Sequence, residues 1–264
     1  MSSADVSRAT REANESPVVE WGARVGFAVL GLLHLVIGYI ALKVAWGFGG
    51  GTKEADQTGA LESLSGNTTG QVLLWVGVAG FALLAIWNVT EGVVSHGETT
   101  DRLKLVAKGV MYAFFSYSVF KIVALGSGGD GEQKTDDVTQ TLMSSPAGQV
   151  VVGVLGLVVL GVAGYHVYKG WKKTFLEDLT EHPGTWAVRA GRAGYVAKGI
   201  ALAVVGFFFL VAAYRADPED AKGLDGALKT VKDMAFGPYL LTLVALGIVA
   251  YGVYSFARAR YARL

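Results

Sequence analysis

The amino-acid sequence predicts an all-α, polytopic membrane protein, with six transmembrane helices that form three repeated helical hairpins in a pseudo-threefold arrangement. Its composition is 52% hydrophobic and 17% charged, whereas a typical soluble protein has about 25% charged residues. Six apolar runs of roughly 20 or more residues are each long enough to cross about 30 Å of hydrocarbon. A short pattern also occurs three times, and each copy contains two of these runs, which indicates a triplicated helical hairpin.

The six expected transmembrane helices follow the apolar runs in order: residues 22–46, 71–94, 103–126, 148–170, 188–214 and 238–257. A soluble bundle of six buried helices is the competing interpretation. Its outer helices would need polar stripes, and segments such as Val150–Val162 have none. The chain also contains 36 glycines but only five prolines, and glycine within apolar runs is typical of membrane helices.

The recurring pattern begins with an arginine that stands seven residues before a glycine. Its three copies pair Arg24 with Gly31, Arg102 with Gly109, and Arg192 with Gly199. The second helix of each unit is entered through a glycine, and an aromatic residue follows 17 positions later. These pairs are Gly70 with Trp87, Gly148 with Tyr165, and Gly237 with Tyr254. The middle copy of the arginine pattern keeps only the arginine and the final glycine.

The repeats divide the chain into a polar cytoplasmic tail, three two-helix units and one cytoplasmic connection. We expect the tail at 1–20, repeat 1 at 21–94, repeat 2 at 95–170, the connection at 171–187, and repeat 3 with a basic C-terminal tail at 188–264. The tail lacks the apolar core and cleavage site of a signal peptide. The first helix is therefore expected to act as an uncleaved signal-anchor.

The basic residues predict how the protein is oriented. Fifteen of the 23 Lys and Arg residues lie in the N-terminal tail with the adjoining Arg24, the 95–108 and 169–198 connections, and the C-terminal tail. Cytoplasmic segments carry the excess of basic residues in membrane proteins. We therefore expect a multi-pass protein of the bacterial cytoplasmic (inner) membrane, with both termini in the cytoplasm.

The three outer loops, 47–69, 127–147 and 215–236, are longer and acidic, and each leads into an eleven-residue segment. These segments are 60–70, 138–148 and 227–237. We expect each to be a short amphipathic element on the outer membrane surface that leads into the next helix. The alternative is a re-entrant element that lines a vestibule.

The three repeat arginines are a candidate polar ring at the cytoplasmic face. We expect Arg24, Arg102 and Arg192 to anchor their helices to lipid headgroups, because long basic side chains near helix ends can reach that interface. The alternative is a basic ring that binds an anionic ligand.

Four residues are candidate intramembrane polar groups, because a polar side chain is costly at membrane depth: His34, Tyr112, Asn88 and His166. His34 lies near the bilayer centre, where it either bonds to a neighbouring helix or acts as a pH-sensitive or ligand-contacting group. A haem between His34 and His166 is not expected, since the two residues lie at different depths. Asn88, His166 and Ser255 share one repeat position, which favours interfacial hydrogen bonding.

Several function classes lack their characteristic residues. No Asp or Glu falls within the core of any span, whereas ion-coupled carriers usually need an intramembrane carboxylate. The chain has no cysteine, no zinc-protease or serine-hydrolase motif and no phosphate-binding loop. We therefore expect no catalytic residue, no metal site, no cofactor and no nucleic-acid partner.

Glycine spacing predicts close helix contacts, most of them between repeats. Gly22 and Gly26 form a Gly-x-x-x-Gly motif, and one later helix contains Gly153, Gly156, Gly161 and Gly164. Small residues let helix backbones approach closely within a membrane.

The chain resembles the bacterial domain-of-unknown-function family numbered 1206. The resemblance rests on Arg-x-Gly-aromatic-x-x-x-Gly at 24–31 and 192–199, and on the Pro-Tyr-Leu-Leu-Thr-Leu-Val-Ala-Leu-Gly stretch that begins at Pro238. It covers roughly residues 21–263, and the second unit departs most. The family implies a six-helix inner-membrane protein, and it implies no activity, cofactor or catalytic residue.

These observations favour a non-enzymatic membrane scaffold or partner-binding subunit. The alternative is a facilitative channel or uncoupled carrier for a small solute or ion. A conduit needs small or polar residues along a continuous axis, whereas a scaffold would fill that axis with Leu, Val and Phe. The expected partners are the lipid bilayer and a further membrane protein, and the pattern does not specify an oligomeric state.

Overall fold

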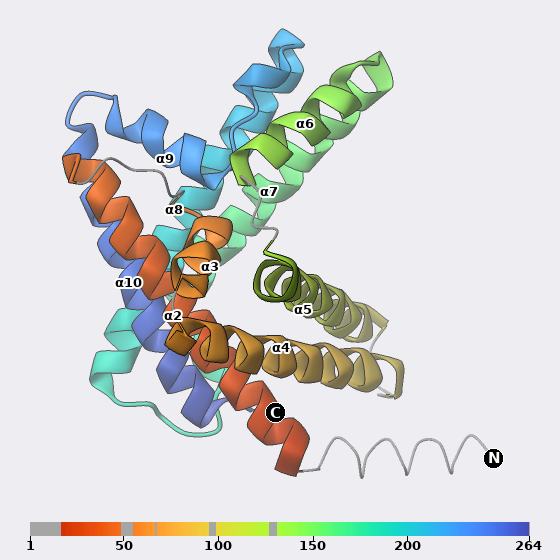
Figure 1. The fold of residues 1–264 in the computed structure, drawn as a ribbon, viewed down its shortest axis with the longest axis vertical. Coiled ribbons are helices and arrows are strands. Elements are labelled where there is room, and N and C mark those ends of the chain that lie inside the picture. Colours follow the sequence, from red (N-terminus) through yellow and green to blue (C-terminus); the bar gives the residue numbers. More distant parts are fainter. Residues whose placement is uncertain (1–16, 49–54, 67, 95–98, 127–130, 264) are drawn as a thin grey trace.

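The computed structural model describes residues 17–48, 55–66, 68–94, 99–126 and 131–263, and this part of the chain is almost entirely helical (Figure 1). Most of the predicted tail, residues 1–16, lies outside the described residues, and the first described helix begins at Pro17. The elements are α2 (Pro17–Trp46), α3 (Gln57–Ser65), α4 (Thr68–Val94), α5 (Thr99–Leu125), α6 (Gly131–Met143), α7 (Pro146–Lys172), η1 (Thr174–Asp178), α8 (Thr185–Arg215), η2 (Pro218–Asp220), α9 (Leu224–Lys232) and α10 (Gly237–Tyr261).

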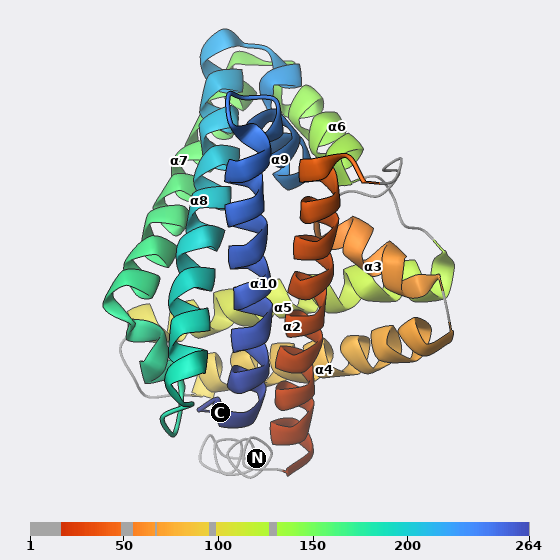
Figure 2. The same ribbon diagram turned by 90° about the vertical axis from the view of Figure 1, so that its left-hand side faces the viewer.

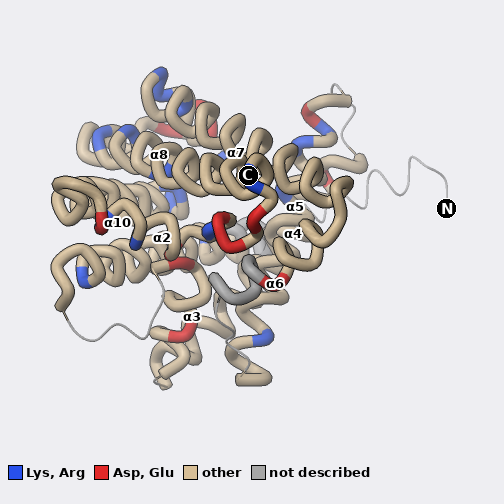
Figure 3. Tube along the Cα trace, turned by 90° about the horizontal axis from the view of Figure 1, so that it is seen from above, with Lys and Arg blue, Asp and Glu red and all other residues tan. Residues whose placement is uncertain are grey.

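Six of these helices are long and apolar enough to cross a membrane, which confirms the predicted fold class. They are α2, α4, α5, α7, α8 and α10. Charged residues are sparse along their lengths (Figure 3). The most apolar stretch of α2 is 61% buried inside the protein, whereas that of α7 is only 17% buried. Helix α2 is therefore a central helix, and α7 presents most of its apolar surface to the bilayer.

Four of the six helices form one layer, and the other two cross it. Helices α7, α8, α10 and α2 run side by side, while α4 and α5 pack together at a steep inclination to them (Figure 2). The most extensive interfaces join the second helix of one unit to the first helix of the next: α4 with α5, α7 with α8, and α10 with α2. The last of these connects unit 3 back to unit 1.

The final glycine of the arginine pattern lies at the same place in all three between-unit interfaces. A Cβ atom at Gly109 would lie 3.0 Å from the Ala85 carbonyl oxygen, and one at Gly199 would lie 2.7 Å from that of Ala163. The corresponding distance from Gly31 to the Gly252 oxygen is 2.9 Å. Cβ atoms rarely or never approach a carbonyl oxygen this closely, so the repeated glycine lets the backbones meet.

A second set of glycines holds the two helices of one unit together, but only in units 1 and 3. A Cβ at Gly26 would lie 2.4 Å from the Leu84 side chain in α4, and one at Gly194 would lie 2.5 Å from the Tyr251 backbone in α10. Unit 2 has Lys104 at the corresponding position, and this side chain is exposed. Between α5 and α7 no comparable interface forms in the described residues.

One short helix leads into the second membrane helix of each unit: α3 before α4, α6 before α7, and α9 before α10. The glycine after each short helix sits against a carbonyl six residues earlier. A Cβ at Gly148 would lie 1.5 Å from the Leu142 oxygen, and the corresponding distance from Gly70 to the Leu64 oxygen is 1.8 Å. A Cβ at Gly237 would lie 2.3 Å from the Val231 oxygen, six residues earlier, and 2.0 Å from the Lys232 oxygen. These three glycines allow the sharp turn between the two helices.

Candidate functional site

The arginines of the repeat pattern lie at the junctions between units. Arg102 donates hydrogen bonds from Nε to the Gly92 oxygen (3.1 Å) and from Nη2 to the Val93 oxygen (3.0 Å). Arg24 does the same at the equivalent positions of α10, with bonds to the carbonyls of Ala259 (3.2 Å) and Arg260. The last carbonyls of a helix have no partner within that helix. Arg24 and Arg102 therefore cap the ends of α10 and α4.

Arg192 occupies the same repeat position but makes a different contact. Its guanidinium carbon lies 5.2 Å from the ring centre of Trp171, the residue equivalent to Val93. Arginine stacks on aromatic faces through this cation–π geometry, which engages the plane of the guanidinium and leaves its N–H groups at the edges. The three arginines thus act at three different junctions, and the third is held by an aromatic ring rather than by two carbonyls.

A cation–aromatic pair accompanies two of the three junctions. Arg258 lies 4.3 Å from the ring centre of Phe27, and Lys169 lies 5.6 Å from that of Tyr195. Arg258 and Lys169 share one repeat position, as do Phe27 and Tyr195. At the α4–α5 junction the corresponding residues are Glu91 and Leu105, so the cation and the ring are replaced together.

In every unit, the polar residue that follows the repeat aromatic residue forms a hydrogen bond within its own helix. Asn88 donates to the Leu84 oxygen, and Ser255 donates to the Tyr251 oxygen, each at 2.8 Å. His166 has its Nδ1 atom 2.8 Å from the Val162 oxygen. Each side chain thus reaches back to the carbonyl four residues earlier, a local bond that satisfies its polar group within its own helix.

His34 and His166 lie at opposite ends of a chain of aromatic rings. The His34 ring centre lies 4.7 Å from that of Tyr251, which is 5.2 Å from Tyr195, which in turn is 5.8 Å from His166. His34 is buried, with Nδ1 2.8 Å from the Leu30 oxygen. Two tyrosine rings therefore stand between the histidines. Tyr112, the remaining candidate, is buried and stacks on Phe81 with the ring centres 6.3 Å apart.

The aromatic cluster is covered at one end by the connection between α7 and α8. The hydroxyl of Tyr254 donates to the Phe175 oxygen at 3.2 Å, and Lys169 forms an ion pair with Asp178 at 2.6 Å. Phe175 is fully buried against Tyr195 and Tyr254. Sequence reasoning did not single out Phe175, because its packing depends on which helices become neighbours.

The absent α5–α7 interface leaves two apolar helix faces exposed. We call this surface the α5–α7 seam; it comprises Lys104, Ala107, Met111 and Phe114 of α5 and Val151, Leu155, Val158 and Val162 of α7, all exposed. The α7 residues recur at spacings of four, three and four, which is the period of one helix face. Val158 replaces the glycine that stands at Gly80 and Gly247 in the other units, where each lies close against the partner helix.

A cavity of about 250 Å³ lies between α2, α3, α4 and α5. Its apolar walls include Leu33, Phe81 and Phe115, and its polar lining residues include Gln57 and Lys121. Among the described residues no three His, Asp or Glu side chains gather in a way that could hold a metal ion.

A triplicated two-helix unit, six membrane-length helices and arginine-capped junctions define a polytopic α-helical membrane protein of internal-repeat architecture. The model of the family described as Domain of Unknown Function (DUF1206) matches residues 25–95, 103–173 and 193–262, one match per unit. The chain belongs to this family, and the predicted membership and three-repeat organisation are confirmed.

A relative from Bacillus subtilis (strain 168), described as the uncharacterized protein YxxB, is 26% identical over 258 residues. The alignment covers 93% of this chain and 92% of the relative. No solved structure matches the chain.

Proposed function

We propose that this protein is a non-enzymatic scaffold of the bacterial inner membrane, and that the α5–α7 seam binds one transmembrane helix of a partner protein. The proposal rests on a difference in helix packing within the three units. Units 1 and 3 close through glycine contacts, while unit 2 has Lys104 and Val158 at the matching positions, both exposed. An open helix pair in a protein that closes its other two offers space for a further helix.

The packing of the interior supports a scaffold over a conduit. Large apolar side chains fill the region where α2, α4 and α5 meet, among them Leu33, Phe81 and Ile122. The sequence also offers no carboxylate in the core of a span for ion coupling. The cavity beside these residues is lined mainly by apolar groups, which favours a packed interior over a polar path for a solute.

Exposed glycines on α7 add a second reason to expect a helix partner. A Cβ at Gly161 or Gly164 would meet no atom within 4 Å, so these two glycines serve no contact within the described chain. Small residues on membrane helices allow close helix–helix approach. They lie on the exposed surface of α7 outside the seam itself.

Site-specific photo-crosslinking in intact cells tests the seam. We expect a photoreactive residue at Val151, Val158 or Val162 to yield one and the same adduct with an integral membrane protein. Leu240 is the matched control, because it occupies the repeat position of Val151 and both are 46% exposed. Val154 controls for the exposed α7 face outside the seam.

The pattern of adducts decides the outcome. A shared adduct at the three seam positions, absent at Val154 and Leu240, would support a docked helix. Equal labelling at all five positions would contradict it, because random collision in the bilayer is not periodic. A crosslink to a second copy of the chain would contradict a separate partner protein and indicate self-association through the seam.

The proposed orientation places Glu181 in the cytoplasm and Asp233 outside, because the basic residues gather around the former connection. Both side chains are exposed. We expect a single cysteine at Asp233 to react with a membrane-impermeant thiol reagent on whole cells. A cysteine at Glu181 should react only after the cells are opened. Reaction at Glu181 alone would reverse the orientation.

A further inference from the structure

A groove of about 570 Å³ runs along the outer surface between α8 and α10, with a contribution from the end of α7. It lies away from the α5–α7 seam. Its long walls are apolar and include Val196, Ile200 and Leu243, while the small residues Ala193 and Gly247 line it as well. Gly247 packs directly on α8, since a Cβ there would lie 2.1 Å from the Ala197 Cβ. The two helices therefore meet closely along the groove.

One end of the groove carries concentrated positive charge. Arg189 and Arg192 both line it and are exposed, and they lie three residues apart, which places them on one face of α8. Like charges at this spacing repel each other, so an anion between them would be stabilising. Trp171, which is 65% exposed, holds the Arg192 guanidinium by stacking and leaves its N–H edges for a ligand.

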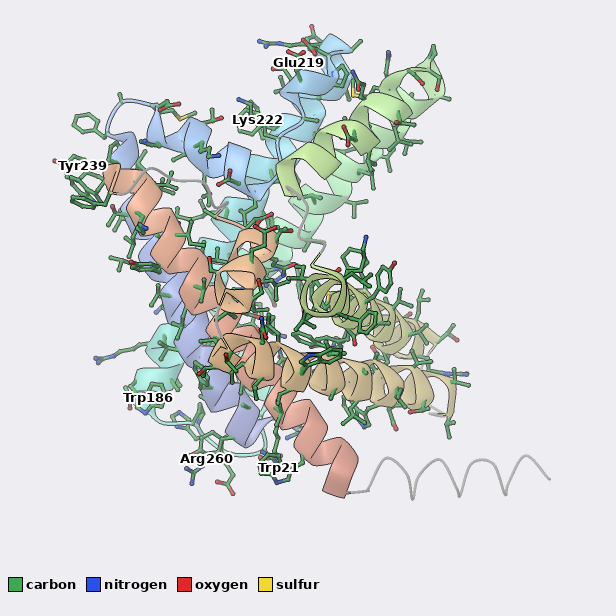
Figure 4. All side chains as sticks on the ribbon, in the orientation of Figure 1. Trp21, Trp186, Glu219, Lys222, Tyr239 and Arg260 are labelled. Atoms are coloured by element: carbon green, nitrogen blue, oxygen red, sulfur yellow. The ribbon has the colours of Figure 1, made fainter. Side chains whose placement is uncertain are left out.

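The charged end of the groove lies at the end of the molecule where a membrane interface is expected. Trp186, one turn before Arg189, lies at the same end as Trp21 and Arg260, opposite Glu219 and Lys222 (Figure 4). Exposed tryptophans gather at the headgroup level of membranes. The arginines therefore sit near the depth of lipid phosphates, and the apolar walls continue from there towards the membrane core.

We infer that this groove binds one anionic phospholipid. Arg189 and Arg192 would hold its headgroup phosphate, and an acyl chain would lie along Val196, Ile200 and Leu243. From Arg189 to Ile200 the helix rises about 16 Å at 1.5 Å per residue, which is close to half of the roughly 30 Å hydrocarbon thickness. The groove thus has the length of one leaflet, and an arginine pair matches a phosphate through bidentate hydrogen bonds.

The comparison among the three repeat arginines strengthens this assignment. Arg24 and Arg102 donate hydrogen bonds from their N–H groups to the carbonyls of helix ends. Arg192 occupies the same repeat position, yet its partner is the ring of Trp171. A second arginine one turn earlier, Arg189, has no basic counterpart in units 1 and 2, where Trp21 and Thr99 stand. Only unit 3 thus combines a stacked arginine, a second cation and an apolar groove.

Native mass spectrometry of the full-length protein in mild detergent tests the site. Phosphatidylglycerol and phosphatidylcholine with identical acyl chains are titrated separately, and glycerol phosphate is added as a soluble competitor. We expect phosphatidylglycerol to bind at least tenfold more tightly than phosphatidylcholine. Glycerol phosphate in millimolar excess should displace less than half of the bound lipid, because it lacks the acyl chains.

Matched variants locate the binding. The double variant Arg189→Gln/Arg192→Gln should weaken phosphatidylglycerol binding about tenfold or more, since each cation near a lipid phosphate contributes appreciably. The control Lys173→Gln/Arg260→Gln removes two exposed cations outside the groove and should change binding less than twofold. Ala193→Phe, which fills the groove, should weaken binding while both arginines remain.

The readout keeps folding and binding apart. The melting temperature of each variant in detergent without lipid identifies any that unfold. If the double glutamine variant unfolds, Arg192→Lys, which keeps the charge, replaces Arg192→Gln in it. Equal affinity for the two lipids, or double-variant binding within twofold of the unmodified protein, would overturn the inference. Full displacement by glycerol phosphate would also overturn it, in favour of a site for soluble anions.

Discussion

Replacing Gly148 with alanine is expected to lower the stability of the protein strongly, by about 1–3 kcal/mol, a typical cost for forcing an extra carbon into a packed site. The added Cβ would lie 1.5 Å from the Leu142 oxygen. This oxygen belongs to the backbone, so it cannot move aside as a flexible side chain could. Either the turn between α6 and α7 opens, or α7 shifts, and both changes disturb the Ser145 cap, whose Oγ accepts from the Gly148 amide at 3.2 Å.

The measurement is the unfolding midpoint in detergent, and the same helix supplies the control. Gly161 is another glycine of α7, but a Cβ there would meet no atom within 4 Å. Gly161→Ala should therefore be neutral or slightly stabilising, because alanine favours the helix by about 1 kcal/mol over glycine. If Gly148→Ala were as stable as Gly161→Ala, the close approach of the two helices in each outer loop would be wrong.

Replacing Arg102 with alanine is expected to cost about 1–2 kcal/mol of stability. The substitution removes two hydrogen bonds to the Gly92 and Val93 oxygens, at about 1 kcal/mol each for partly exposed groups. It also removes a positive charge from a helix C-terminus, where cations are favourable. Arg102→Lys should recover only part of this loss, because an ammonium group cannot span two carbonyls as the planar guanidinium does.

The three repeat arginines provide an internal comparison for this experiment. Arg24→Ala should resemble Arg102→Ala, since both arginines cap a helix end. Arg192→Ala should cost less in lipid-free detergent, because the residue stacks on an exposed ring instead. Thermal unfolding of the three alanine variants side by side checks this order. Equal losses at all three positions would contradict the distinction between capping and stacking.

The candidate site could be foreseen from the sequence only in part. The repeated arginines and glycines stood out because a threefold recurrence marks positions under a common constraint. The constraint itself was not visible: anchoring to lipid was expected, whereas Arg102 bonds to the end of α4. The role of Arg192 depended on Trp171, a residue in a different unit that the repeat pattern does not mark.

What the sequence determined by itself was the number, length and order of the membrane helices. Apolar runs of membrane length have few alternatives to a helix, because every backbone polar group must find a partner away from water. These features depend on local composition and spacing, which is why they could be predicted. The glycine contacts could not be predicted in the same way: Gly22 and Gly26 pack against α4 within unit 1, and a Cβ at Gly161 or Gly164 would meet no atom within 4 Å.

Only the tertiary structure decided which helices pair. The same repeat is compatible with contacts within a unit or between units, because both place small residues on one helix face. In the fold the largest interfaces lie between units, and the contact within unit 2 is missing. Two side chains, Lys104 and Val158, occupy the space that glycines leave elsewhere, so the backbones of α5 and α7 cannot approach as their counterparts do. The missing interface between α5 and α7 thus breaks a symmetry that the repeat pattern alone predicts.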